Sequence, residues 1–226
     1  MAYRNFTVWK DLYDLKYDMY KTDFVTLKSG LTILSGCNGA GKSSLILQLQ
    51  QELEKQGIMN LTYNDVIHGR NRAMDDALNV KYDIKLLGIL ATSSEGEQLY
   101  HNLAEFARKI GDTVRRCAKI NKRELWIFLD ASDSGLSIDK IEELKKFIRM
   151  VLNDAVKSKI DMYFVVAANE YEMCRGEQCY YLPDMEYKEF KTYDDYRQAI
   201  LDSRKYKDTC LENLKETLDK IGRAHV

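Results

Sequence analysis

An apolar run that ends in a glycine-rich turn and continues as a helix decides the fold expected of this chain: residues 31–50 read LTILSGCNGAGKSSLILQLQ. The run Leu31–Ser35 is typical of a buried strand. After the turn, leucines recur every fourth residue from Leu45 to Leu53, which predicts a helix with Gly57 as its C-terminal cap. We therefore expect a strand, a glycine-rich loop and a helix in direct succession.

The glycine-rich loop has the composition of a phosphate cradle, because Gly36 to Ser43 fits the pattern G-x-x-x-x-G-K-[ST]. Glycines let successive backbone N–H groups point at phosphate oxygens, and the following helix adds the positive end of its dipole. In this pattern Lys42 reaches the β- and γ-phosphates of ATP, and the hydroxyl of Ser43 binds Mg²⁺. The residues predicted to bind the nucleotide are Gly36, Asn38, Gly39, Ala40, Gly41, Lys42, Ser43 and Ser44.

A second apolar run, in LWIFLDASDSGLS at residues 125–137, ends in Asp130. An aspartate at the end of a buried strand downstream of a phosphate loop holds Mg²⁺, usually through water. We therefore predict that Asp130 and Ser43 share one metal ion.

Short apolar strands alternate with helices along the rest of the chain, which favours an α/β fold with a largely parallel sheet. The N-terminal segment should add antiparallel strands through a hairpin that turns at Ser29-Gly30 and leads into the buried strand. A polar segment, residues 65–78, is expected to be loop and then helix. The strands are expected at 4–9, about 17–35, 58–63, 124–130 and 161–169, and the helices at 42–57, 96–119, 139–157 and from 193 onward.

Three stretches, GCNGAGKSS, TSSEGEQLYHNL and LDASDSGLS, occur in this order, and together they resemble the ABC-type ATPases of the SMC and RecF kind. The resemblance implies a single P-loop NTPase domain over residues 1–226, with a signature-bearing helical lobe at about 64–120 and a helical tail at about 193–221. It further implies that Ser94, Gly96 and Glu97 form the signature motif, which contacts the ATP of a second subunit and so makes an ATP-dependent homodimer. Alone, Ser94 and Glu97 also fit an ordinary capping box at a helix start.

The sequence departs from that family at several positions. Ala131 stands where the family has the glutamate that polarises the attacking water, and Asn169 stands where a switch histidine is expected. The Q-loop glutamine is missing, and Asn64 or Asp65 is the substitute we expect. The chain has no room for a long coiled coil, so it resembles a stand-alone ATPase head, as found in phages and mobile elements.

These departures affect the residues needed to hydrolyse ATP and leave those needed to bind it in place. The groups needed to bind ATP and Mg²⁺ are present, including Lys42 and Asp130, whereas Ala131 supplies no base. A general base is typically worth ~10²–10⁴-fold in rate. The remaining candidates for the catalytic role are Asp133, Glu170 and Asn169. An aspartate in this position is more often a turn residue than a base, and a glutamate is more often a solvated surface residue. We therefore expect an ATP-binding switch with slow hydrolysis.

Composition limits the rival functions. The chain has 226 residues and a net charge of −1, so charge gives no indication of nucleic-acid binding, although a local basic patch is compatible with it. Five cysteines without metal-ligand spacing indicate reduced thiols in the cytoplasm, and no segment is apolar enough for a membrane span. The resemblance suggests a link to DNA metabolism. Two alternatives stay open: a non-catalytic nucleotide-sensing subunit that regulates a nuclease or other effector, and a nucleotide kinase, for which we find no Arg-rich lid.

Overall fold

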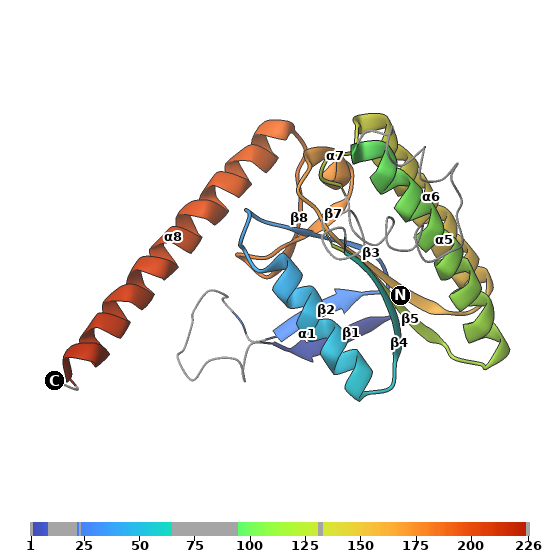
Figure 1. Ribbon diagram of the computed structural model, residues 1–226, viewed down its shortest axis with the longest axis horizontal. Coiled ribbons are helices and arrows are strands. Elements are labelled where there is room, and N and C mark those ends of the chain that lie inside the picture. Colours follow the sequence, from blue (N-terminus) through green and yellow to red (C-terminus); the bar gives the residue numbers. More distant parts are fainter. Residues whose placement is uncertain (1, 9–21, 23, 65–94, 131–132, 225–226) are drawn as a thin grey trace, which may run out of the picture.

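The computed structural model describes residues 2–8, 22, 24–64, 95–130 and 133–224, which form an α/β fold around a six-stranded sheet (Figure 1). The strand order is β4-β5-β6-β3-β7-β8, and every neighbouring pair is parallel except β7 and β8. The strands are β3 (Gly30–Ser35), β4 (Met59–Asn64), β5 (Glu124–Asp130), β6 (Asp161–Ala167), β7 (Gln178–Tyr181) and β8 (Glu186–Glu189). The predicted α/β class with a mostly parallel sheet is confirmed.

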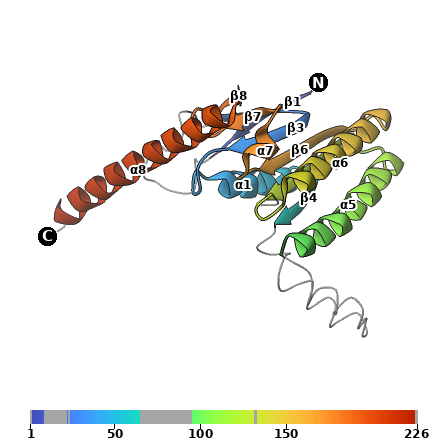
Figure 2. The ribbon, with the colours of Figure 1, turned by 90° about the horizontal axis from the view of Figure 1, so that it is seen from above.

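Helices cover both faces of this sheet. Figure 1 shows α1 on one side and α5 with α6 on the other, and Figure 2 shows the same layers from above. The long helix α8 begins beside the sheet and runs away from it, so the C-terminus lies far from the rest of the fold. The helices are α1 (Lys42–Lys55), α5 (Glu95–Lys119), α6 (Ile138–Lys157), α7 (Tyr171–Cys174) and α8 (Tyr193–Ala224).

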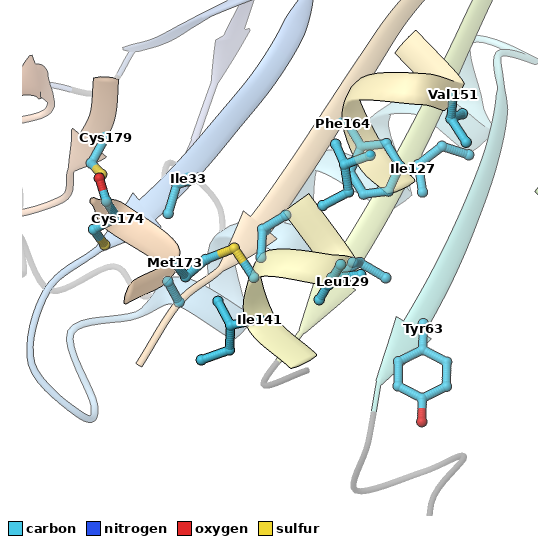
Figure 3. Close-up of a cluster of buried hydrophobic side chains, with 14 of the residues drawn as sticks. Ile33, Tyr63, Ile127, Leu129, Ile141, Val151, Phe164, Met173, Cys174 and Cys179 are labelled. Atoms are coloured by element: carbon cyan, nitrogen blue, oxygen red, sulfur yellow. The ribbon is translucent and has the colours of Figure 1, made fainter. Parts of the chain in front are cut away.

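The central strands are apolar on both faces, which is why each face has its own core. On β5, Ile127 and Leu129 point into the core shared with α5, α6 and α7, part of which Figure 3 shows. Trp126 and Phe128 point the opposite way, toward α1, and Trp126 stacks on Tyr163 with ring centroids 4.1 Å apart. Such continuous apolar runs are typical of parallel strands that are buried on both sides.

The predicted hairpin at Ser29-Gly30 is wrong. The strand β2 (Phe24–Lys28) pairs instead with β1 (Tyr3–Thr7) in a separate antiparallel sheet, whereas β3 lies in the large sheet. Val25 and Leu27 of β2 are fully buried in the core on the α1 side, so burial of their side chains holds β2 over the face of the large sheet. The expected antiparallel N-terminal strands are thus present, with a different partner for β2.

Other local predictions are confirmed. Gly57 adopts φ 65°, its N–H donates to the Glu54 carbonyl, and the N–H of Ile58 donates to the Leu53 carbonyl, so α1 ends in a Schellman motif. The predicted helix at 139–157 and the tail from 193 are both present as α6 and α8. The sequence did not predict β7, β8 or α7, and the segment 65–78 lies outside the described residues.

The register of the sheet places three strand ends at one level. Leu34 of β3 and Asp130 of β5 both pair with Ala167 of β6. The loops that follow these three strands therefore leave the same edge of the sheet, where ligands of open α/β folds bind. Among the described helices, none combines the length and apolar character needed to cross a membrane.

Candidate functional site

The loop between β3 and α1 has a backbone that only glycines adopt easily. Gly39 and Gly41 have φ values of 79° and 90°, and Gly41 directly precedes the first residue of α1. A side chain at such angles is strained, since L-residues avoid the left-handed region. The sequence therefore shapes a loop that curls around the amino end of α1, with Asn38 exposed at its tip and Ala40 buried beneath it.

Lys42 turns back over this loop. Its Nζ atom donates hydrogen bonds to the carbonyl oxygens of Gly36 at 2.9 Å and Cys37 at 3.3 Å, and the residue is only 7% exposed. Burial lowers the pKa of the ammonium, and the nearby Asp133, Cys37 and Asp130 oppose that shift. A buried cation held by two loop carbonyls is well placed to meet an anion that enters the loop.

Ser43 and Asp130, predicted to share a metal ion, lie in direct contact. The Ser43 hydroxyl donates to Oδ1 of Asp130 at 2.9 Å, and Asp130 is 4% exposed. Both groups are oxygen donors, which is the ligand type that Mg²⁺ prefers, with waters and substrate phosphates completing its shell. Within the described part of the chain, no group of three or more His, Cys, Asp or Glu residues is arranged to hold a metal. The pair therefore fits Mg²⁺ held largely by waters and phosphates.

Asp133 is the most deeply buried carboxylate beside the loop. It is fully buried, and its Oδ2 atom accepts the backbone N–H groups of Asn169 at 2.7 Å and Glu170 at 2.8 Å. Burial raises the pKa of this carboxyl, and the two N–H bonds oppose the rise. Its Oδ1 atom has no hydrogen-bond partner among the residues that the structure describes. One oxygen of Asp133 thus fixes the segment after β6, while the other is buried without a described partner.

The segment after β6 carries the other two catalytic candidates. The Asn169 side chain donates to the Ser134 hydroxyl at 2.9 Å, so it faces the loop after β5. Glu170 is exposed, and its described hydrogen bond to Asp133 uses the backbone. The structure therefore brings Asn169 to the Asp133 turn through its side chain, and Glu170 through its backbone N–H.

Several predicted residues are described only in part or not at all. Ala131 and Ser94 lie outside the described residues. Gly96 and Glu97 fall in the first turn of α5, which begins at Glu95, and both the signature motif and the capping box predict a helix start there. Asn64 ends β4 at the level of Asp130 in β5, and Ser44 is exposed in the first turn of α1.

Helix α8 supplies site contacts that the sequence analysis missed. The Ser203 hydroxyl accepts the N–H of Cys37 at 3.1 Å, and Lys207 Nζ donates to the Asn38 carbonyl at 3.2 Å. The Tyr196 hydroxyl donates to the Asn169 carbonyl at 2.9 Å. These positions lie on one face of the helix, and their spacing of seven and four residues was the available signal.

No family model, curated protein or solved structure matches this chain.

Proposed function

We propose that the chain binds ATP with Mg²⁺ at the loop 36–44 and acts as an ATP-dependent switch that hydrolyses its nucleotide slowly. The observation that carries this proposal is the contact of the Ser43 hydroxyl with Asp130 at 2.9 Å, beside a loop over which Lys42 is folded. A loop hydroxyl and a strand-end carboxylate in contact supply two groups that hold Mg²⁺ in phosphate-loop ATPases, and Lys42 supplies the cation for the phosphates.

The proposed roles follow the chemistry of each group. Backbone N–H groups of the loop and the amino end of α1 favour the phosphate oxygens. Lys42 would exchange its two loop carbonyls for the β- and γ-phosphates, whose negative charge would oppose the lowering of its pKa by burial. Ser43 and Asp130 would hold Mg²⁺, which would supply positive charge against the charge that develops on the phosphates.

Slow hydrolysis is proposed because, among the described residues, no carboxylate is placed to act as a strong base at the loop. The residue after Asp130 is alanine. Asp133 is fully buried, with one oxygen already accepting two backbone N–H groups, and Glu170 shows no described side-chain contact to the loop. A general base must reach the water from which it takes a proton, so either residue would require rearrangement around bound ATP.

The resemblance to ABC-type ATPases of the SMC and RecF kind extends the proposal to a homodimer that closes on two ATP molecules, with Ser94, Gly96 and Glu97 reaching the partner's nucleotide. A two-fold dimer would make the two sites equivalent. A cytoplasmic, DNA-related role is part of the same proposal.

A second function is favoured by one observation. Asp133, in the turn after β5, accepts the backbone N–H groups of Asn169 and Glu170. This arrangement gives the carboxylate a structural role and does not present it to an attacking water. The chain would then be a nucleotide-sensing subunit that regulates an effector, such as a nuclease. A phosphate-release assay, alone and with DNA, separates this function from the first.

The binding site itself is tested by calorimetric titration of ATP–Mg²⁺ into the parent, Lys42→Ala and Lys55→Ala. Lys55 is the control because it ends the same helix, far from the loop. We expect binding to vanish in Lys42→Ala and to persist in Lys55→Ala. Equal binding by the parent and Lys42→Ala would show that the nucleotide site lies elsewhere.

A further inference from the structure

One face of α8 lies against the site. Tyr196, Ala199 and Ser203 are all buried, and Lys207 is half-buried one turn beyond Ser203. Residues spaced by three or four positions share one side of a helix, so these four form a single stripe along α8. Ser203 is 1% exposed, which is rare for a serine unless its hydroxyl is hydrogen-bonded.

The stripe contacts two separate segments at the sheet edge. Tyr196 donates to the Asn169 carbonyl after β6, while Ser203 and Lys207 contact Cys37 and Asn38 in the loop after β3. Between them, the Tyr181 hydroxyl of β7 donates to the Ala199 carbonyl at 2.7 Å. Helix α8 is therefore bonded to the phosphate loop and to the segment that Asp133 fixes.

Lys207 lies beside Gly39, at a position of the loop whose backbone conformation favours glycine. A Cβ atom added to Gly39 would lie 2.6 Å from Lys207 Nζ. The ammonium of Lys207 thus lies against the Asn38–Gly39 peptide and donates to the Asn38 carbonyl oxygen. A phosphate is a hydrogen-bond acceptor like this oxygen, so a bound phosphate would not compete with the oxygen for a loop N–H group. Its positive charge adds to the potential of the loop, because partly buried charges are screened less than exposed ones.

We propose that Ser203 and Lys207 are positioning residues of the phosphate loop, so that nucleotide binding and the docking of α8 strengthen each other. The inference rests on the proposed function of the loop. Ser203 fixes the Cys37 N–H and Lys207 fixes the Asn38 carbonyl, which orders the loop before the anion arrives. Coupling between two binding events is reciprocal, so a nucleotide that orders the loop also stabilises α8 on it. Binding of a nucleotide at the loop would then change how firmly α8 is docked, and this change would extend along the helix toward its C-terminal end.

The first test compares ATP–Mg²⁺ affinity by calorimetry in the parent, Lys207→Met, Lys207→Arg and Lys205→Met. Lys205 is the matched control because it is an exposed lysine two residues away on the same helix. Loss of one charge beside the loop should weaken binding about threefold to tenfold in Lys207→Met. Lys207→Arg should restore near-parent affinity, and Lys205→Met should match the parent. Thermal unfolding of each variant shows whether the fold is kept.

The second test needs no variant at α8. Hydrogen exchange of the parent backbone over residues 196–207 should slow when ATP–Mg²⁺ binds, and should not change in Lys42→Ala, which cannot bind. Parent-like affinity in Lys207→Met, or ATP binding without slower exchange in α8, would overturn the inference and leave the proposed function standing. Absence of ATP binding by the parent would overturn the proposed function and this inference with it.

Discussion

The Oδ2 atom of Asp133 accepts the backbone N–H of Asn169 at 2.7 Å and so ties the turn after β5 to the segment after β6. The two residues are far apart in sequence, and the parallel register of β5 and β6 brings their strand ends level. Asp133 also accepts the N–H of Glu170, and charge-assisted bonds of this kind are stronger than neutral ones. The edge of the sheet beside the loop 36–44 is thereby held by a buried carboxylate.

Replacement of Asp133 by asparagine should change how stability depends on pH. Burial raises the pKa of Asp133 above 3.8 in the folded chain, so the folded state keeps a proton that the unfolded chain has released. Between the two pKa values, the free energy of unfolding of the parent therefore falls as pH rises, by up to about 1.4 kcal/mol per pH unit. Urea unfolding at a series of pH values should show this fall missing in Asp133→Asn. Parallel profiles for both proteins would contradict the prediction.

Removal of the Ser43 hydroxyl should reduce the effect of Mg²⁺ on ATP binding. In the proposed site, this hydroxyl and Asp130, which lie in hydrogen-bond contact, would both hold the ion. We expect Mg²⁺ to strengthen ATP binding by the parent about tenfold or more, relative to binding with a chelator, and to strengthen binding by Ser43→Ala clearly less. Asp154→Asn, which changes an exposed carboxylate on α6, serves as the control. A variant that still responds to Mg²⁺ as the parent does would remove Ser43 from the metal site.

Turnover should be slow. Without a glutamate after Asp130, we expect phosphate release below the ~1 s⁻¹ low end of typical enzymes. A faster rate would show that another side chain provides the base, and the same assay on Asp133→Ala and Glu170→Ala would identify it.

ATP should double the mass of the protein in solution. In the proposed dimer, residues 94–97 would contact the partner's γ-phosphate, which ADP lacks. Light scattering without nucleotide, with ADP and with ATP–Mg²⁺ should give a dimer only with ATP–Mg²⁺, and Ser94→Arg should remain monomeric. A monomer at saturating ATP and micromolar protein, or an equal dimer in all three conditions, would favour the capping-box interpretation.

Two glycine-to-alanine changes should have opposite effects on stability. Gly39 has φ 79°, so Gly39→Ala should destabilise the fold by about 1–2 kcal/mol and displace Lys207. Gly111 lies within α5, where a Cβ atom would meet only the Arg115 side chain at 4.0 Å. Gly111→Ala should therefore stabilise by about 0.5–1 kcal/mol. Urea unfolding measures the change in the free energy of unfolding for both variants. If both variants were stabilised or both destabilised, local backbone conformation would not explain the effect of alanine at these two positions.

Patterns that are local in the sequence predicted local structure well. Leucines every fourth residue before Gly57 gave α1 and its end, and the apolar run before Asp130 gave β5 with its stated bounds. These features depend on residues within one or two turns of each other, which is the range that periodicity reports. The hairpin at Ser29-Gly30 failed because strand pairing is decided by where Val25 and Leu27 are buried, and that surface is formed by residues distant in sequence.

The sequence by itself determined the α/β class, the positions of α1, α6, α8 and β5, and the glycine-rich loop with Lys42 and Ser43, because each depends on residue type and short-range spacing. Only the tertiary structure decided that Ser43 lies against Asp130, that Asp133 holds Asn169, and that Ser203 and Lys207 of α8 contact the loop. These contacts join segments between 36 and 169 residues apart. Sheet register and helix docking bring such segments together, and both depend on how apolar faces are buried across the whole chain.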